Sequence, residues 1–132
     1  MPTEKHAPRH TPKQTAASLQ RVRAICLGLP DTTEKLSHGA PSFFLPTGQY
    51  LSFVDNHHGD GRLAVWMAAP PGMQESLIEA EPQHFFRPPY VGPSGWVGIN
   101  LNTGLERGAI AALIAQGHAW IAAKKKRRAR RT

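Results

Sequence analysis

Hydrophobic positions recur at helical spacing near both ends of the chain. The N-terminal stripe, typical of the buried face of an amphipathic helix, consists of Leu19, Val22, Ile25 and Leu29. The preceding residues 11–14 (TPKQ) have the composition of a capping box, with Thr as N-cap, Pro at the first helical position and Gln two residues after it. We therefore expect a helix that begins after Thr11 and ends at Gly28 and Pro30.

The C-terminal stripe predicts a second long helix. Its apolar positions are Ile110, Leu113, Ile114, Gly117 and Ile121. Residues 103–106 (TGLE) have the composition of another capping box, so we expect this helix to start there and to continue to about Ala123. A short helix is predicted between Met73 and Glu81, because Pro82 then stops it.

Between these helices the apolar residues alternate, which predicts strands. The expected strands, separated by turn residues, are Thr33–Ser37, Ser42–Leu45, Gln49–Asp55, Arg62–Ala68 and Trp96–Leu101. In the third, we expect Tyr50, Ser52 and Val54 on one face and Leu51 and Phe53 on the other. Strands grouped between helices predict an α+β domain, with an antiparallel meander and all three helices packed on it.

One stretch, His84–Leu101 (HFFRPPYVGPSGWVGINL), concentrates aromatic residues among prolines and glycines. Proline fixes the backbone and glycine permits close approach, so the first half of this stretch is predicted to be rigid and irregular. Phe85 and Phe86 are expected in the core. Tyr90 and Trp96 are expected on a more open face.

Three segments carry a resemblance to a known family. They are residues 85–98 (FFRPPYVGPSGWVG), 33–41 (TEKLSHGAP) and 55–63 (DNHHGDGRL). Together they resemble the MmcQ/YjbR-like family of small, mostly bacterial proteins, over about residues 19–122. The resemblance implies an α+β, YjbR/CyaY-like fold with an antiparallel sheet. It also implies DNA binding, which is how the family is usually described.

The net charge of +7 is concentrated at the ends of the chain. Residues 1–14 carry +2 and residues 124–132 carry +7, whereas residues 15–123, with six basic and eight acidic side chains, carry −2. We therefore expect a disordered arm over residues 1–10, one domain over residues 11–123 and a basic tail over residues 124–132. The single cysteine, Cys26, excludes an internal disulfide framework and fits a reducing compartment, so we expect a cytoplasmic protein.

The basic tail suggests the first functional hypothesis, weak DNA binding without sequence preference. Phosphate contacts would come from Lys124, Lys125, Lys126, Arg127, Arg128, Arg130, Arg131 and Arg87. A solubilising helix end is the alternative interpretation of this charge. Membrane binding is not expected, because the tail lacks interleaved aromatic residues.

The second hypothesis is a non-enzymatic module that binds a small molecule or a protein. It would use the Tyr90/Trp96 surface and the His57-His58 loop, with a pocket lined by His38, His84, Tyr90 and Trp96. Catalysis ranks third, because no nucleophile is paired with a histidine in the sequence. We expect a monomer with no cofactor.

A metal site is the remaining alternative for the histidines. His57 and His58, with Asp55 and Asp60, have the side-chain types of a zinc site. Adjacent histidines rarely meet one ion, however, so we expect a polar hairpin loop without a bound metal.

Overall fold

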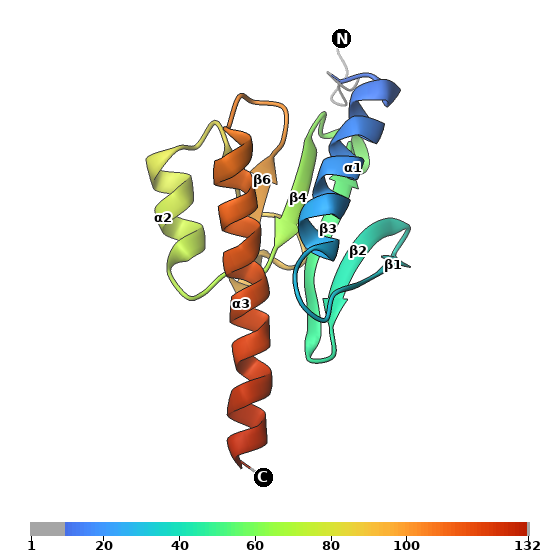
Figure 1. Ribbon diagram of the computed structural model, residues 1–132. Coiled ribbons are helices and arrows are strands. Elements are labelled where there is room, and N and C mark those ends of the chain that lie inside the picture. Colours follow the sequence, from blue (N-terminus) through green and yellow to red (C-terminus); the bar gives the residue numbers. More distant parts are fainter. Residues whose placement is uncertain (1–9, 132) are drawn as a thin grey trace.

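The computed structural model describes residues 10–131, and it describes side chains as far as Lys124. Three α-helices and six β-strands are present in this part of the chain (Figure 1). In chain order they are α1 (Pro12–Leu27), β1 (Thr33–Ser37), β2 (Ala40–Leu45), β3 (Gly48–Asp55), β4 (Leu63–Met67), α2 (Met73–Ala80), β5 (Phe85–Phe86), β6 (Val97–Asn100) and α3 (Arg107–Arg131). Short 3-10 turns occupy His57–Gly59 and Gly92–Ser94.

The strands form one antiparallel sheet in the order β1-β2-β3-β4-β6-β5. The first four strands are a meander. The chain then leaves the sheet through α2, forms the edge strand β5 and returns as β6 between β4 and β5. The predicted α+β class with an antiparallel sheet is confirmed. Strand β5 was not predicted, because two residues are too few to show an alternating pattern.

Helices α1 and α3 cover one face of the sheet (Figure 1). The core between them and the sheet includes Phe43, Leu51, Phe53, Val65, Met67 and Ile99, each at most 3% exposed. Side chains that alternate with these point to the other face, where Ser52, Trp66 and Gly98 lie in register across β3, β4 and β6. Helices α1 and α3 lie on the opposite side of the sheet from that face (Figure 1).

A β-bulge changes which residues of β3 face the helices. Phe43 pairs with Leu51 and Phe44 pairs with Gln49, so Tyr50 has no partner on β2. The extra residue lets the neighbours Tyr50 and Leu51 both enter the core, where each is fully buried. The prediction that Tyr50 shares a face with Ser52 is therefore wrong, because strict alternation stops at the bulge.

The displaced Tyr50 ties the sheet to both long helices. Its hydroxyl lies 2.9 Å from Thr32 Oγ1 and 3.4 Å from the carbonyl oxygen of Cys26 on α1. Its ring meets the ring of His118 on α3 edge to face, with 5.2 Å between centroids. Burial raises the pKa of the Cys26 thiol to about 12, so this cysteine is an inert core residue.

The two predicted capping boxes had different outcomes. At α1, Thr11 Oγ1 accepts a hydrogen bond from the Gln14 amide, and the Gln14 side chain accepts one from the Thr11 amide. At α3 the prediction is wrong, because the helix begins at Arg107. The Thr103 hydroxyl instead lies 2.7 Å from Nδ1 of His84, the residue immediately before β5.

Helix α3 approaches the sheet closely and then extends past it (Figure 1). At Gly117, an added Cβ would lie 2.8 Å from the carbonyl oxygen of Ala68, so only glycine fits without a shift of the backbone. The helix was expected to end near Ala123, but it continues to Arg131.

Candidate functional site

A cavity of about 630 Å³ opens on the sheet face that α1 and α3 leave uncovered. Its floor is formed by side chains of β3 and β4, and its rim by the β1–β2 turn, the β3–β4 turn and the loop before β6. The lining residues are Ser37, His38, Ala40, Gln49, Ser52, Val54, His57, Trp66, Tyr90, Val91 and Trp96. They include aromatic and imidazole rings close to small polar groups, and no Asp, Glu, Lys or Arg.

The polar wall of the cavity depends on the bulge in β3. Because Tyr50 is extruded toward the helices, Gln49 and Ser52 come to the same side of the strand. Gln49 Nε2 donates to Ser52 Oγ, which also lies 3.0 Å from Ser42 Oγ. Ser42 in turn donates to the carbonyl oxygen of Ala40, at 3.0 Å. This chain of hydrogen bonds fixes the polar groups that a ligand would meet.

The opposite rim is held by α2. Gln74, 3% exposed, donates from Nε2 to the carbonyl oxygens of Gly92, at 2.9 Å, and of Trp96. Its Oε1 accepts from Arg87 Nη1, at 3.2 Å. A buried amide with both ends bonded positions the loop, and with it the half-buried Trp96.

His57 occupies the centre of an aromatic cluster beside the cavity. Its ring lies edge to face against Trp66, Tyr90 and His58, with centroid distances of 5.0, 5.8 and 4.0 Å. The backbone around it is tightly turned, since Asn56, His58 and Tyr90 all have positive φ. The Tyr90 hydroxyl reaches to 3.4 Å from His58 Nε2.

The environment of His57 disfavours its charged form. Burial lowers the pKa of His57, the nearby charge of His58 lowers it further, and Asp60 acts in the opposite direction. Its Nε2 atom is buried and has no hydrogen-bond partner among the described residues. A neutral imidazole with an unused ring nitrogen can donate or accept one hydrogen bond from a ligand.

The structure brings together three of the four residues predicted to form a pocket. His38, Tyr90 and Trp96 line the cavity, and Tyr90 is 73% exposed. His84 lines none of this cavity, since its ring contacts Thr103 and lies 3.7 Å from Glu81 Oε1. The structure therefore places His84 apart from the other three residues. The residue faces the turn before α3, on the far side of β6.

Sequence reasoning missed the cavity roles of Trp66 and Gln49, whereas the His57-His58 loop was expected to contribute to binding. The alternation of side chains along β4 places Trp66 on the opposite face from Val65. Only the pairing of the strands shows that Trp66 lies between Ser52 and Gly98. The Phe86 ring lies directly over Gly98 and occupies the space that a Cβ at this position would need. Phe86 thus fills the open face at the β5 edge, and the cavity is confined to the β1 side.

The histidine loop is a hairpin connection, as predicted. Asp55 pairs with Leu63 on either side of it. Asp55 bonds to His10, and Asp60 accepts from the Arg62 amide at 2.9 Å, so neither carboxylate forms a hydrogen bond with His57 or His58. Within residues 10–124, no three His, Cys, Asp or Glu side chains are grouped as a metal site. Among the described helices, none has the length and apolarity required to cross a bilayer.

The basic residues named in the DNA-binding hypothesis lie in different places. Arg87 lies against Gly92, beside Gln74, and Lys124 has its Nζ 5.7 Å from the centroid of the Trp120 ring. Lys125, Lys126, Arg127, Arg128, Arg130 and Arg131 belong to the last turns of α3, and their side chains are outside the described part of the chain.

Comparison with known proteins identifies the family. The family model for YjbR matches residues 27–120, which include every residue that lines the cavity. The chain belongs to the YjbR family. The predicted resemblance is thereby confirmed. The basic tail of this YjbR protein, residues 124–132, lies outside the matched region.

Among solved structures, this YjbR protein resembles the Deinococcus radiodurans protein DR2400, a DUF419-domain protein known from a crystal structure. The TM-score is 0.67 and the sequence identity 16%, over 78% of this chain and 77% of that chain. At this identity the likeness supports the fold alone. No curated protein matches the sequence significantly.

Proposed function

We propose that this YjbR protein is a non-enzymatic binding module whose cavity accepts a flat, uncharged heteroaromatic compound. The observation that supports this most directly is the combination of Trp66, Trp96, Tyr90 and a neutral His57 around one cavity of about 630 Å³. That volume falls within the ~300–1,000 Å³ of small-molecule sites, which are mostly apolar with a few fixed polar groups.

The side chains favour a flat and neutral ligand. Trp66, Trp96 and Tyr90 offer ring surfaces against which a flat ring can pack face to face or edge on. Among the residues that the structure describes, no charged carboxylate, ammonium or guanidinium lines the cavity to compensate the desolvation of a ligand charge.

The polar groups favour a ring that carries heteroatoms. Gln49 and Ser52 lie on one wall and the imidazole ring of His57 lies on another. A ring nitrogen or an exocyclic carbonyl of the ligand could form hydrogen bonds with these polar groups.

A binding role is favoured over catalysis because the described lining of the cavity lacks an activated nucleophile. Ser52 is engaged by Ser42 and Gln49, and neither partner is a base. Cys26, the single cysteine, is buried behind the sheet. A serine without an adjacent base is a weak nucleophile at neutral pH.

The test is a titration of isotope-labelled protein followed through the indole N–H signals of its three tryptophans. Quinoline serves as the flat neutral probe, N-methylquinolinium as its charged match and cyclohexanol as its non-planar match. We expect quinoline to shift Trp66 and Trp96 and to leave Trp120, on α3, unchanged. Quinoline should bind about tenfold or more tightly than either comparison compound.

Two histidine variants provide matched tests. His57→Gln should weaken quinoline binding by about tenfold, because it removes the imidazole from the cluster. His84→Gln changes the same residue type outside the cavity and should leave the affinity unchanged. Equal losses in both variants, or no binding of quinoline below about 1 mM, would contradict the proposal.

Nucleic-acid binding through the end of α3 is the second candidate function. It is supported by the seven Lys and Arg residues between positions 124 and 131, on a helix that extends past the sheet (Figure 1). In this proposal residues 124–132 act as a basic tail attached to the domain of residues 11–123. It ranks second because Arg23, a possible extension of the basic surface, is paired with Glu34 at 2.9 Å.

A further inference from the structure

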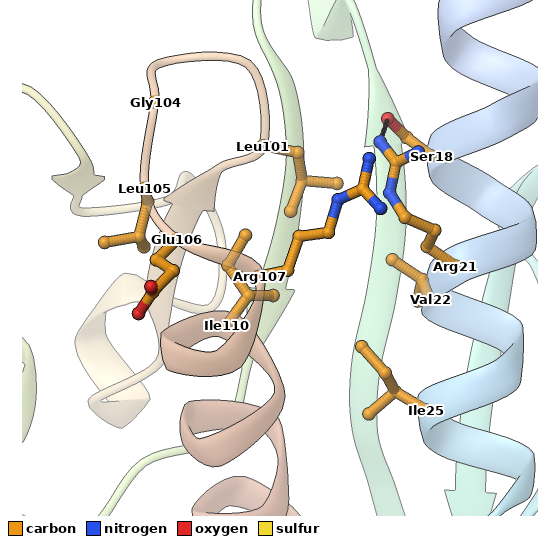
Figure 2. A pocket seen from close by; sticks show the side chains of 10 residues that line it. All are labelled: Ser18, Arg21, Val22, Ile25, Leu101, Gly104, Leu105, Glu106, Arg107 and Ile110. Atoms are coloured by element: carbon orange, nitrogen blue, oxygen red, sulfur yellow. Dashed lines mark hydrogen bonds between the residues drawn. The ribbon is translucent and has the colours of Figure 1, made fainter.

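A second cavity, of about 370 Å³, lies between α1 and the first turn of α3 (Figure 2). It is formed on the helical side of the sheet, so it is separate from the cavity at Trp96. Its apolar surface comes from Val22 and Ile25 on α1, Ile110 on α3 and Leu101 at the end of β6. Val22 and Ile110 are 2% and 8% exposed, which anchors both sides of the cavity in the core.

Two arginines from different helices share the mouth of this cavity. Figure 2 shows the guanidinium groups of Arg21, from α1, and Arg107, from α3, pointing toward one another. Arg21 uses one nitrogen to donate to Ser18 Oγ, at 3.1 Å. Arg107 forms no hydrogen bond or ion pair with any side chain described between residues 10 and 124.

The one acidic residue in the described lining of this cavity does not neutralise the pair. The carboxylate of Glu106 points away from both guanidinium groups, on the far side of the loop next to Leu105 (Figure 2). Two like charges that face each other repel, and they do so more strongly over an apolar surface than in bulk water. An anion placed between them would remove that repulsion and bond to both.

Other arginines of the domain are already engaged. Arg23, two residues after Arg21, makes a bidentate contact with Glu34. Arg62 lies over the Phe86 ring, 4.0 Å from its centroid, and also donates to Asn100. Arg21 and Arg107 differ in having unused donors above a concave apolar surface.

We propose that this second cavity binds a small amphiphilic anion, with a carboxylate or phosphate-ester head between Arg21 and Arg107 and a short apolar chain over Val22, Ile25 and Ile110. The guanidinium group matches both head groups, because its planar donors form paired, charge-assisted hydrogen bonds with oxyanions. The volume, at the low end of the range for ligand sites, limits the chain to a short one.

Octanoate and octyl phosphate are the probes, with octanol, octylamine and acetate as matched comparisons. Binding is followed by methyl NMR shifts of Val22, Ile25 and Ile110, with the Trp96 indole signal reporting on the other cavity. We expect octanoate or octyl phosphate to bind at least tenfold more tightly than each comparison compound and to shift only the three aliphatic residues. The tighter of the two identifies the head group. The affinity should also fall as salt is added.

The variant Arg21→Gln/Arg107→Gln should reduce that affinity at least tenfold. Arg23→Gln removes one positive charge from α1, outside the cavity, and should change the affinity for the probe less than twofold. The proposal is overturned if octanol binds as tightly as octanoate, or if Arg23→Gln and the double variant have equal effects. Shifts at Trp96 in place of Ile110 would also overturn it. The proposal is also overturned if octanoate and octyl phosphate bind to the unmodified protein with an affinity that does not depend on salt.

Discussion

The imidazole of His57 meets the indole of Trp66 edge to face, with 5.0 Å between the ring centroids. Because Trp66 forms part of the cavity floor, this contact links the protonation state of His57 to the floor of the cavity. A protonated His57 would lie in the partly buried, less polar environment that already lowers the pKa of this residue.

Stability should therefore decrease as the pH falls below neutrality. An unfolded histidine takes up a proton near pH 6.5, whereas folded His57 does so only at lower pH. In the window below about pH 6.5 the unfolded state binds more protons, so the free energy of unfolding falls with pH. Urea denaturation from pH 7.5 to 5 should show a smaller decrease for His57→Gln than for the unmodified protein. An unchanged pH dependence in this variant would contradict the prediction.

The two tryptophans of the cavity should differ in their contribution to stability. Trp66 is 9% exposed and lies on β4, between the strands β3 and β6. Its replacement by Ala should lower the free energy of unfolding by about 3–5 kcal/mol. Trp96 is half-buried on the rim, and Trp96→Ala should cost about half as much while removing quinoline binding. Denaturant unfolding of both variants is the measurement. A cost for Trp96→Ala as large as that for Trp66→Ala would identify Trp96 as a core residue.

Two glycines of α3 make a matched pair. Gly117→Ala should destabilise the fold by about 1–3 kcal/mol, because the added methyl group meets the Ala68 carbonyl oxygen. Gly108→Ala, in the first turn of the same helix, places its methyl group where no atom lies within 4 Å and should stabilise the fold by about 0.5–1 kcal/mol. The difference in thermal unfolding between the two variants measures how closely α3 approaches the sheet.

The basic end of α3 can be tested with duplex DNA. If five to seven of its charges meet phosphates, the slope of log affinity against log salt should be about −4.5 to −6, at ~0.9 per contact. Deleting residues 124–132 should flatten this slope and remove most of the affinity. Arg87→Gln should change the slope by about one unit at most, since Arg87 is held beside Gln74. Equal binding with and without the tail would exclude it as the site.

The sequence predicted most elements of the fold because their patterns are local. The stripe of α1 and the alternation of β3 and β4 each depend on residues within one element. The bulge at Tyr50 was not predictable in this way, because it is a mismatch between β2 and β3 that neither strand shows alone. The role of Thr103 was missed for a similar reason, since its partner, His84, is 19 residues away.

The candidate site was predicted in part. Tyr90 and Trp96 are recognisable because large aromatics lie there among prolines and glycines, where a regular core strand is not expected. His38 and His84 are both histidines near turns, and only the register of the sheet separates them, with His38 at the β1–β2 turn and His84 beyond β6. The sequence predicts a polar hairpin loop at His57, whereas the contacts of this residue with Trp66 and Tyr90 could be known only from the folded loop.

The strand order β4-β6-β5 also bears on how the chain folds. Strands β1 to β4 pair with sequence neighbours across short turns, so their contacts require little loop closure. Strand β6 reaches β4 only after residues 68–96 have been brought back to the sheet, at a larger entropic cost. We expect the meander to form in the folding transition state and β6 to dock after it. Conservative variants at Phe43 and Leu51 should then slow folding, whereas variants at Val97 should mainly speed unfolding. The rim that carries Trp96 would be completed last.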